Sequence, residues 1–311
     1  MFKEKNLLII GGSGFFGKSI LDYLNRKNFQ SKIYILSRNV DVIKSNEFEN
    51  LHINKISTDI VEFNRLPDIS EIIYAATPSD KAEYQKKGRN IIENVNLGIK
   101  NFSNLLKNEK FDGKLLYISS GAIYGPQSDE KNISEDSEIV NYSNFSFDKQ
   151  IYAESKEYSE NIIKNLGVKG FKVSIARCFA FIGKYLPQNS HFIIGNIINS
   201  IVNKKEFELL AKNKVFRSFM HTDDLSEWLF EILNVSNNTC PIFNVGSDEF
   251  FELRDLVKIF NNKYNLSYSI KYPEAFGNTD WYVPSIEKIS NKLGCKIKFN
   301  LETSINKIFN L

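Results

Sequence analysis

The sequence predicts an α/β protein built on a doubly wound, Rossmann-type parallel sheet, and two observations carry this prediction. Short apolar runs alternate with segments of helical periodicity through the amino-terminal half of the chain. The first run, Leu7–Ile10, leads into glycines and then into a helical segment over 18–26, which gives strand, tight turn and helix in order. Strands that alternate with helices pair in parallel through right-handed crossovers, so helices cover both faces of the sheet.

The remaining elements follow the same logic until Arg177, where the rhythm changes. Short apolar runs predict strands at 33–36, 51–53, 72–75, 115–118, 173–176 and 243–246. Helical patterns predict helices near 82–108, 149–166, 191–203, 253–260 and 286–293. We therefore expect a dinucleotide-binding domain over 1–177, with roughly 215–246 returning to it. Residues 178–214 and 247–311 are expected to form a smaller substrate-binding lobe at the carboxyl edge of the sheet.

The composition limits the classes of function. The chain has 311 residues and is 42% hydrophobic, enough for one large core or two smaller ones. Forty Lys and Arg against 37 Asp and Glu leave a charge of +3 without a basic block, so we expect no nucleic-acid binding. The three cysteines are far apart, which predicts free thiols, no disulfide and no zinc site. A charged amino terminus and the lack of a long apolar run predict a cytoplasmic protein without membrane contact.

A glycine motif lies between the first strand and the first helix. Its G-x-x-G-x-x-G spacing permits a tight turn and a close approach of backbone to a pyrophosphate at the helix amino end. A turn used only for packing is the alternative, but the position in a βαβ series favours dinucleotide binding. The residues expected to bind the cofactor here are Gly11, Ser13, Gly14, Phe15, Phe16 and Gly17.

The ends of the next three strands predict the rest of the cofactor site. Arg38 follows the second strand, where NAD-binding proteins carry an acidic residue for the ribose, and an arginine there suits a 2′-phosphate. We therefore favour NADP(H) over NAD(H), with a solvated surface arginine as the alternative. Asp59 and Ile60 after the third strand, and Ala75 and Ala76 after the fourth, are expected to line the nucleotide, with Asp59 able to bond the adenine amino group.

Tyr152 and Lys156 are spaced by one helical turn, so a lysine ammonium can lie near a phenol and favour its ionised form. Such a phenol can serve as the acid/base partner of hydride transfer. The spacing alone is common, since Tyr23 and Lys27 share it in the helix after the glycine turn, where packing against the sheet is expected. Only the Tyr152 pair follows the strand that ends at Ser120, and this order of elements favours the catalytic interpretation.

A set of motifs in this order resembles the extended short-chain dehydrogenase/reductases of the NAD-dependent epimerase/dehydratase family, which act on nucleotide sugars. The segments that carry the resemblance are 11–17 (GGSGFFG), 117–125 (YISSGAIYG), 152–156 (YAESK), 177–183 (RCFAFIG), 217–224 (RSFMHTDD) and 243–246 (FNVG). They extend over most of the chain. The resemblance implies an oxidoreductase of the Rossmann type that binds a nucleotide-diphosphate sugar.

The resemblance also implies roles for single residues. Ser120 would bond the reacting oxygen, Tyr152 would act as acid/base, and Lys156 would bind the cofactor ribose and lower the phenol pKa. Arg217 would contact the substrate diphosphate, with a surface arginine as the alternative. Further substrate contacts are expected from Tyr124, His191 and Asn196. His221 with Asp223 is interpreted as a helix start rather than a metal site.

The chain departs from the 4,6-dehydratases that it resembles at Gly121 and Ala122. Those enzymes carry an Asp-Glu pair after the catalytic hydroxyl residue, and decarboxylating relatives carry a glutamate at the second position. Neither side chain here can transfer a proton, which disfavours both reactions. Two reactions remain that need only Ser, Tyr, Lys and the cofactor: reduction of a keto sugar and 4-epimerisation.

Because reductases use a diffusible cofactor, commonly NADPH, Arg38 favours reduction. We expect a 4-ketoreductase acting on a nucleotide-linked 4-keto-6-deoxyhexose in deoxysugar synthesis for a surface polysaccharide. A 4-epimerase is the alternative. A non-catalytic NAD(P)-binding regulator would be a different class, disfavoured because the chain keeps both Tyr152 and Lys156. Relatives commonly form homodimers, and we expect the same here.

Overall fold

The computed structural model describes residues 5–78, 86, 88–188, 192–204, 209, 213–264 and 279–309. Its main layer is a seven-stranded sheet in the order β10-β6-β5-β4-β1-β2-β3, in which every pair is parallel. The strands are β1 (Leu7–Ile10), β2 (Lys32–Ser37), β3 (His52–Ser57), β4 (Glu71–Tyr74), β5 (Lys114–Ser120), β6 (Lys172–Cys178) and β10 (Ile242–Val245). This order confirms the predicted doubly wound fold.

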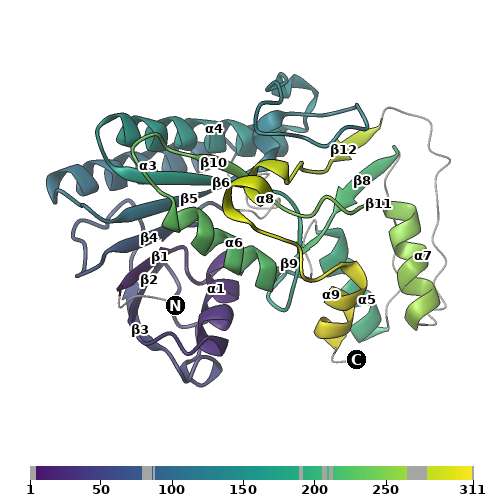
Figure 1. Cartoon of the computed structure of the whole chain (residues 1–311), viewed down its shortest axis with the longest axis horizontal. Helices are drawn as coiled ribbons and strands as arrows, with labels where there is room; N and C mark the ends of the chain where they lie inside the picture. Colours follow the sequence, from purple (N-terminus) through teal and green to yellow (C-terminus); the bar gives the residue numbers. More distant parts are fainter. Residues whose placement is uncertain are drawn as a thin grey trace.

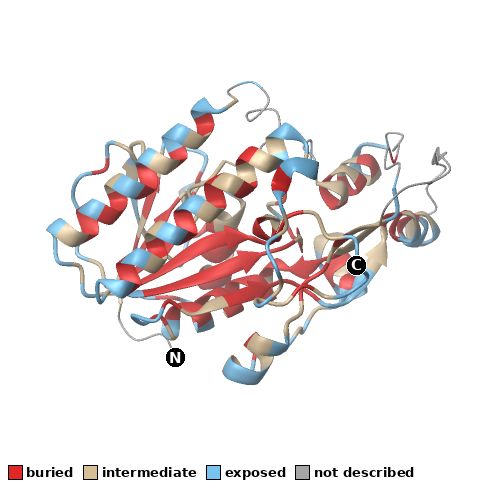
Figure 2. Ribbon diagram, turned by 90° about the horizontal axis from the view of Figure 1, so that it is seen from above, coloured by how far each residue is buried: buried red, intermediate tan, exposed pale blue. Residues whose placement is uncertain are grey.

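Helices cover both faces of the sheet (Figure 1). On one face lie α1 (Phe15–Arg26) and α6 (Thr222–Asn234), and on the other lie α3 (Asn90–Asn108) and α4 (Phe147–Val168). Figure 2 shows the strands at the centre of the sheet as buried. Alternate residues of β1 enter the two cores, since Leu7 and Ile9 pack with one and Leu8 and Ile10 with the other. A strand buried on both faces requires an unbroken apolar run.

A smaller lobe follows the main sheet (Figure 1). Its three-stranded sheet has the order β11-β8-β12, and β7 pairs with β9 beside it. The strands are β7 (Phe181–Ile182), β8 (Val215–Ser218), β9 (Met220–His221), β11 (Phe250–Glu252) and β12 (Asp280–Tyr282). The helices of this lobe are α5 (Ile193–Asn203), α7 (Leu253–Tyr264) and α9 (Leu301–Phe309). The short helix α8 (Glu287–Leu293) instead lies against β10, and its Ile289 packs in the core of the main sheet. A separate apolar core joins α5, α7 and α9.

The pairing of β8 bears on where the division between the two lobes falls. The segment from roughly 215 was assigned to the dinucleotide-binding domain, but β8 pairs with β11 and β12 in the smaller sheet. The return to the main layer comes with α6 and β10. We propose a boundary between Ser218 and Thr222.

Three further expectations concern single features of the chain. No helix in the described ranges combines the length and the apolar character needed to cross a membrane. Cys178, Cys240 and Cys295 are buried free thiols. Across the part of the chain that the structure describes, no cluster of three or more His, Cys, Asp or Glu side chains could hold a metal ion.

Candidate active site

The glycine turn and the end of β4 touch at the centre of the sheet. Gly11 has φ +81°, and a Cβ at this position would lie 2.8 Å from backbone atoms of Ala75 and Ala76. Gly17 is equally constrained, because its Cβ would lie 2.2 Å from the carbonyl oxygen of Gly12. The strand order reverses between β1 and β4, and open α/β sheets bind ligands at such a switch point. The turn therefore has the form of a dinucleotide site.

The other residues predicted at this turn lie around the start of α1. Gly14 is the N-cap of the helix, which has no acidic residue in its first turn, so its free N–H groups suit a pyrophosphate. Ser13 Oγ hydrogen-bonds Ser37 Oγ at the end of β2. Phe15 and Phe16 pack on each other with ring centroids 5.3 Å apart. Both rings also contact Phe181, at 6.0 and 5.7 Å, which joins the turn to the smaller lobe.

The residues predicted for the adenosine end gather at the same edge of the sheet. The Arg38 guanidinium lies 3.9 Å from the Asp59 carboxylate and is 63% exposed, so the cation is loosely held and accessible. Asp59 is oriented by the N–H of Val61, which donates to Oδ1 at 3.0 Å. Ile60 packs towards α3, where a Cβ on Gly98 would lie 2.7 Å from its methyl group. Their contacts with a cofactor stay predictions.

Tyr152 and Lys156 lie on α4, facing the carboxyl end of β5. Lys156 is only 3% exposed. Its ammonium donates to the Ile118 carbonyl oxygen at 2.7 Å and to Thr77 Oγ1 at 3.0 Å. It also lies 5.8 Å from the centre of the Tyr152 ring. The lysine thus ties α4 to the ends of β4 and β5.

The electrostatics of this pair differ from the sequence-based expectation. Burial raises the pKa of Tyr152 to about 12, although the hydrogen bond with Ser120 lowers it. Burial also lowers the pKa of Lys156 to about 7, partly offset by Cys178 and Glu160. A lysine that is only partly charged near neutrality cannot strongly favour a phenolate. In the protein alone, desolvation outweighs the attraction that the spacing suggested.

Ser120 ends β5 and is shared between two phenols. It hydrogen-bonds Tyr152, and its Oγ lies 3.5 Å from the hydroxyl of Tyr282 on β12. The serine also accepts from the Ala122 N–H at 3.2 Å, which fixes its rotamer. Sequence reasoning missed Tyr282, because it lies 162 residues further along the chain and belongs to no motif.

A buried ion pair supports this arrangement. Glu160 lies one turn after Lys156 on α4 and is 0% exposed. Arg177 on β6 donates to both carboxylate oxygens, at 3.0 and 2.8 Å, and Ser119 Oγ donates to one of them at 2.7 Å. These bonds hold the pKa of Glu160 below its usual range. The network fixes α4 against β5 and β6, beside the catalytic candidates.

The predicted substrate contacts have different outcomes. Arg217 is ion-paired with Asp280 at 2.7 Å, and its guanidinium carbon lies 5.5 Å from the centre of the Tyr282 ring. Tyr124 is 0% exposed, and its hydroxyl donates to Asn244 Oδ1 at 2.8 Å, so its contact with a substrate stays a prediction. Asn196 is half-buried in the first turn of α5. His191 lies outside the described residues.

Phe179 takes the space next to Gly121. A Cβ on Gly121 would lie 2.7–2.9 Å from three atoms of the Phe179 ring, so any larger side chain there requires the ring to move. That ring is 8% exposed and packs on Tyr282, with centroids 4.7 Å apart. An acidic side chain at position 121 would therefore have to displace the Phe179 ring.

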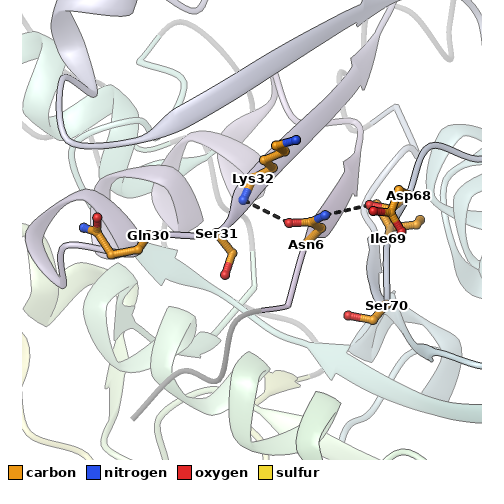
Figure 3. Close-up of a pocket in the computed structure, with 7 residues that line it drawn as sticks. All are labelled: Asn6, Gln30, Ser31, Lys32, Asp68, Ile69 and Ser70. Atoms are coloured by element: carbon orange, nitrogen blue, oxygen red, sulfur yellow. Dashed lines mark hydrogen bonds between the residues drawn. The ribbon is translucent and has the colours of Figure 1, made fainter.

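A pocket of about 450 Å³ lies elsewhere, at the amino ends of β1 and β2 (Figure 3). Its polar groups bond one another: the Asn6 side chain accepts from the Lys32 N–H and donates to the Asp68 carbonyl oxygen. None of the predicted site residues lines it. The carboxyl edge of the sheet, where the predicted residues gather, is the candidate active site.

Residues 7–246 match the NAD dependent epimerase/dehydratase family. The match covers most of the chain, so the protein belongs to this family, and the resemblance carried by its motifs is confirmed. The protein is thus an enzyme of the short-chain dehydrogenase/reductase type.

Three curated relatives are similar to this chain. The dTDP-D-glucose 4,6-dehydratase of Dictyostelium discoideum is 28% identical over 82% of this chain and 61% of its own length. The bifunctional polymyxin resistance protein ArnA of Wigglesworthia glossinidia brevipalpis is 26% identical, and the chain spans 51% of it. The dTDP-4-dehydro-6-deoxyglucose reductase of Escherichia coli is 22% identical over 98% of this chain and 97% of its own length.

Solved structures share the fold. The dTDP-glucose 4,6-dehydratase of Streptomyces venezuelae, solved with NAD, has a TM-score of 0.81 at 18% identity, covering 98% of this chain and 96% of that one. The UDP-glucose 4-epimerase of Thermotoga maritima, solved with UDP-glucose, has a TM-score of 0.80 at 16% identity, covering 98% of both chains. At such identities the likeness establishes the architecture alone, because the reaction depends on the residues of the site and not on the fold.

Proposed function

We propose that this protein is a nucleotide-sugar 4-ketoreductase that acts on a nucleotide-linked 4-keto-6-deoxyhexose. Two observations carry the proposal: Phe179 fills the space beside Gly121 that an acid for dehydration would need, and the exposed Arg38 favours the diffusible NADPH of a reductase over the retained NAD of an epimerase. Elimination of water needs an additional acid and base, which Gly121 and Ala122 do not supply. Two relatives named as reductases, from Escherichia coli and Pseudomonas aeruginosa, support this choice.

The site residues have the chemistry that reduction requires. NAD(P)H, when bound, supplies the hydride for the carbonyl carbon. Ser120 would hold the carbonyl oxygen, and Tyr152 would donate the proton that this oxygen takes up. The pKa of about 12 keeps Tyr152 protonated at neutral pH, which suits a proton donor. Lys156 would hold the ribose and, through Ile118 and Thr77, the position of α4.

The cofactor and substrate follow from the same edge of the sheet. The glycine turn would hold the pyrophosphate and Arg38 the 2′-phosphate of NADP(H), since its guanidinium is 63% exposed and only weakly paired. Arg217 would reach the substrate diphosphate, exchanging part of its contact with Asp280. We also propose that the enzyme works in the cytoplasm as a homodimer.

Cofactor consumption tests the reaction. The absorbance of NADPH and NADH is followed with 4-keto-6-deoxyhexoses linked to thymidine, uridine, guanosine or cytidine diphosphate. Loss of one NADPH per sugar reduced is the expected result. Interconversion of 4-hydroxy sugars without net loss of cofactor would instead identify a 4-epimerase and overturn the proposal. Cofactor binding without turnover of any sugar, unchanged in Tyr152→Phe, would identify a regulator.

A further inference from the structure

Tyr282 is a second phenol at the reacting end of the site, supplied by the smaller lobe. Its hydroxyl lies 3.5 Å from Ser120 Oγ and 3.5 Å from the carbonyl oxygen of Cys178. Hydroxyl hydrogen bonds are normally 2.5–3.0 Å long. Both contacts are therefore long, and the hydroxyl of the half-buried Tyr282 can form a shorter bond with another partner.

The backbone around Tyr282 is fixed on both sides. On one side β12 pairs with β8, which places Tyr282 opposite Arg217. On the other side the Trp281 N–H donates to the Gln127 carbonyl oxygen at 2.9 Å, and the Val283 carbonyl accepts from the Ile133 N–H at 2.8 Å. Backbone hydrogen bonds to residues 127 and 133 thus fix β12 on both sides of Tyr282.

The side chain is held as firmly as the backbone. The ring packs on Phe179 at 4.7 Å, and the Arg217 guanidinium lies 5.5 Å from its centre. Burial and the neighbouring Tyr152 raise the pKa of Tyr282, so the phenol stays neutral and can donate. A preorganised neutral donor suits recognition of a substrate hydroxyl.

The geometry of a hexose identifies which hydroxyl this is. If Ser120 and Tyr152 hold the C4 oxygen of the sugar, the Tyr282 hydroxyl beside Ser120 faces a substituent on a ring carbon next to C4. In a 4-keto-6-deoxyhexose C5 carries the ring oxygen and a methyl group, so the neighbouring hydroxyl is that of C3. We propose that Tyr282 binds the C3 hydroxyl and makes the enzyme select sugars that carry it, an inference that rests on the proposed function.

The test compares two sugars and two proteins. The substrates are the nucleotide-linked 4-keto-6-deoxyhexose and its 3-deoxy counterpart, with the nucleotide that gives the fastest turnover. The wild type is expected to prefer the 3-hydroxy sugar by about tenfold to hundredfold in kcat/KM, the range for an unpaired polar group in a site. Tyr282→Phe is expected to bring this ratio close to one. Tyr23→Phe, which removes a buried phenol of α1, is the matched control and should keep the wild-type ratio.

Two results would overturn the proposal. Tyr282→Phe could slow both sugars by the same factor, which would mean that the phenol acts only on Ser120, or it could leave kcat/KM for both sugars at the wild-type values. If the wild type turns over neither keto sugar, the proposed function fails, but the role of Tyr282 is still measurable. Calorimetry with NADPH present then measures the dissociation constants of the 4-hydroxy sugars with and without the C3 hydroxyl. The wild type should bind the 3-hydroxy sugar about tenfold to hundredfold more tightly, and Tyr282→Phe should bind both sugars about equally. Equal affinities in the wild type would reject the inference.

Discussion

The chain contains two Tyr-x-x-x-Lys pairs, Tyr23 with Lys27 on α1 and Tyr152 with Lys156 on α4. Their local geometry is nearly the same, since each lysine nitrogen lies 5.6 or 5.8 Å from the centre of its tyrosine ring. Burial is the main cause that raises the pKa of both tyrosines, in each case to about 12. Neither the spacing nor the pKa of the phenol distinguishes a catalytic pair from a packed one.

The surroundings of the two pairs do differ. Tyr23 packs on Phe230 of α6, with ring centroids 6.2 Å apart, and Lys27 is exposed at the end of α1. Lys156 is buried and bonded to the ends of two strands, and Tyr152 bonds Ser120. Helical spacing therefore produces the pair, whereas the strand ends beside it supply the chemistry.

The largest expected effect separates the two phenols. Tyr152→Phe should lower kcat/KM by about 10²–10⁴, because the proton donor is lost while the ring still fills its space. Tyr23→Phe should leave kcat/KM within about twofold, since its hydroxyl has no part in the site. Steady-state kinetics with the best keto sugar measures both. Equal losses in the two variants would contradict the assignment of Tyr152, and not Tyr23, as the proton donor.

The lysines should differ in how they link stability to pH. Because burial lowers the pKa of Lys156 to about 7, against ~10.4 for an unfolded lysine, the unfolded chain binds more protons between these values. The contribution of Lys156 to the free energy of unfolding therefore rises with pH from about 7 to ~10, by up to ~1.4 kcal/mol per pH unit. It is smallest below pH ~7, where the buried lysine is charged in both states.

Urea unfolding across this pH range measures the effect. Lys156→Met should flatten the rise, and Lys27→Met should keep it, because Lys27 is exposed. The same pH dependence in the wild type and Lys156→Met would show that the buried lysine does not cause it.

A smaller effect concerns Arg38, which follows β2 beside the glycine turn. This residue is expected to act in cofactor binding and not in proton transfer. Arg38→Ala should raise KM for NADPH about tenfold and leave KM for NADH unchanged, since only NADPH carries the 2′-phosphate. Arg65→Ala, at an exposed position after β3, is the matched control. Equal changes in KM for both cofactors would argue against a 2′-phosphate contact.

Much of the fold could be predicted because local patterns carry it. The apolar runs mark all seven strands of the main sheet, and the periodicity finds α4 at 147–168 where the sequence suggested 149–166. The sheet that β8 joins could not be predicted, because four residues such as Val215–Ser218 do not indicate their pairing partners. Strand pairing depends on partners far along the chain.

The site divides in the same way. The order of motifs predicted Ser120, Tyr152 and Lys156, and the structure brings them together. Nothing in the sequence neighbourhood of Tyr124 indicates that its hydroxyl donates to Asn244. Tyr282 was missed, since its contact with Ser120 spans 162 residues.

The sequence by itself determined the family, the parallel sheet, the glycine turn and the absence of an acid at Gly121, since each depends on residue type and local spacing. Only the tertiary structure decided that Phe179 fills the space beside Gly121 and that Tyr282 approaches Ser120. It also decided that desolvation, rather than ammonium attraction, governs Tyr152 and Lys156. Burial and long-range contact are properties of the packed chain, and no local pattern encodes them.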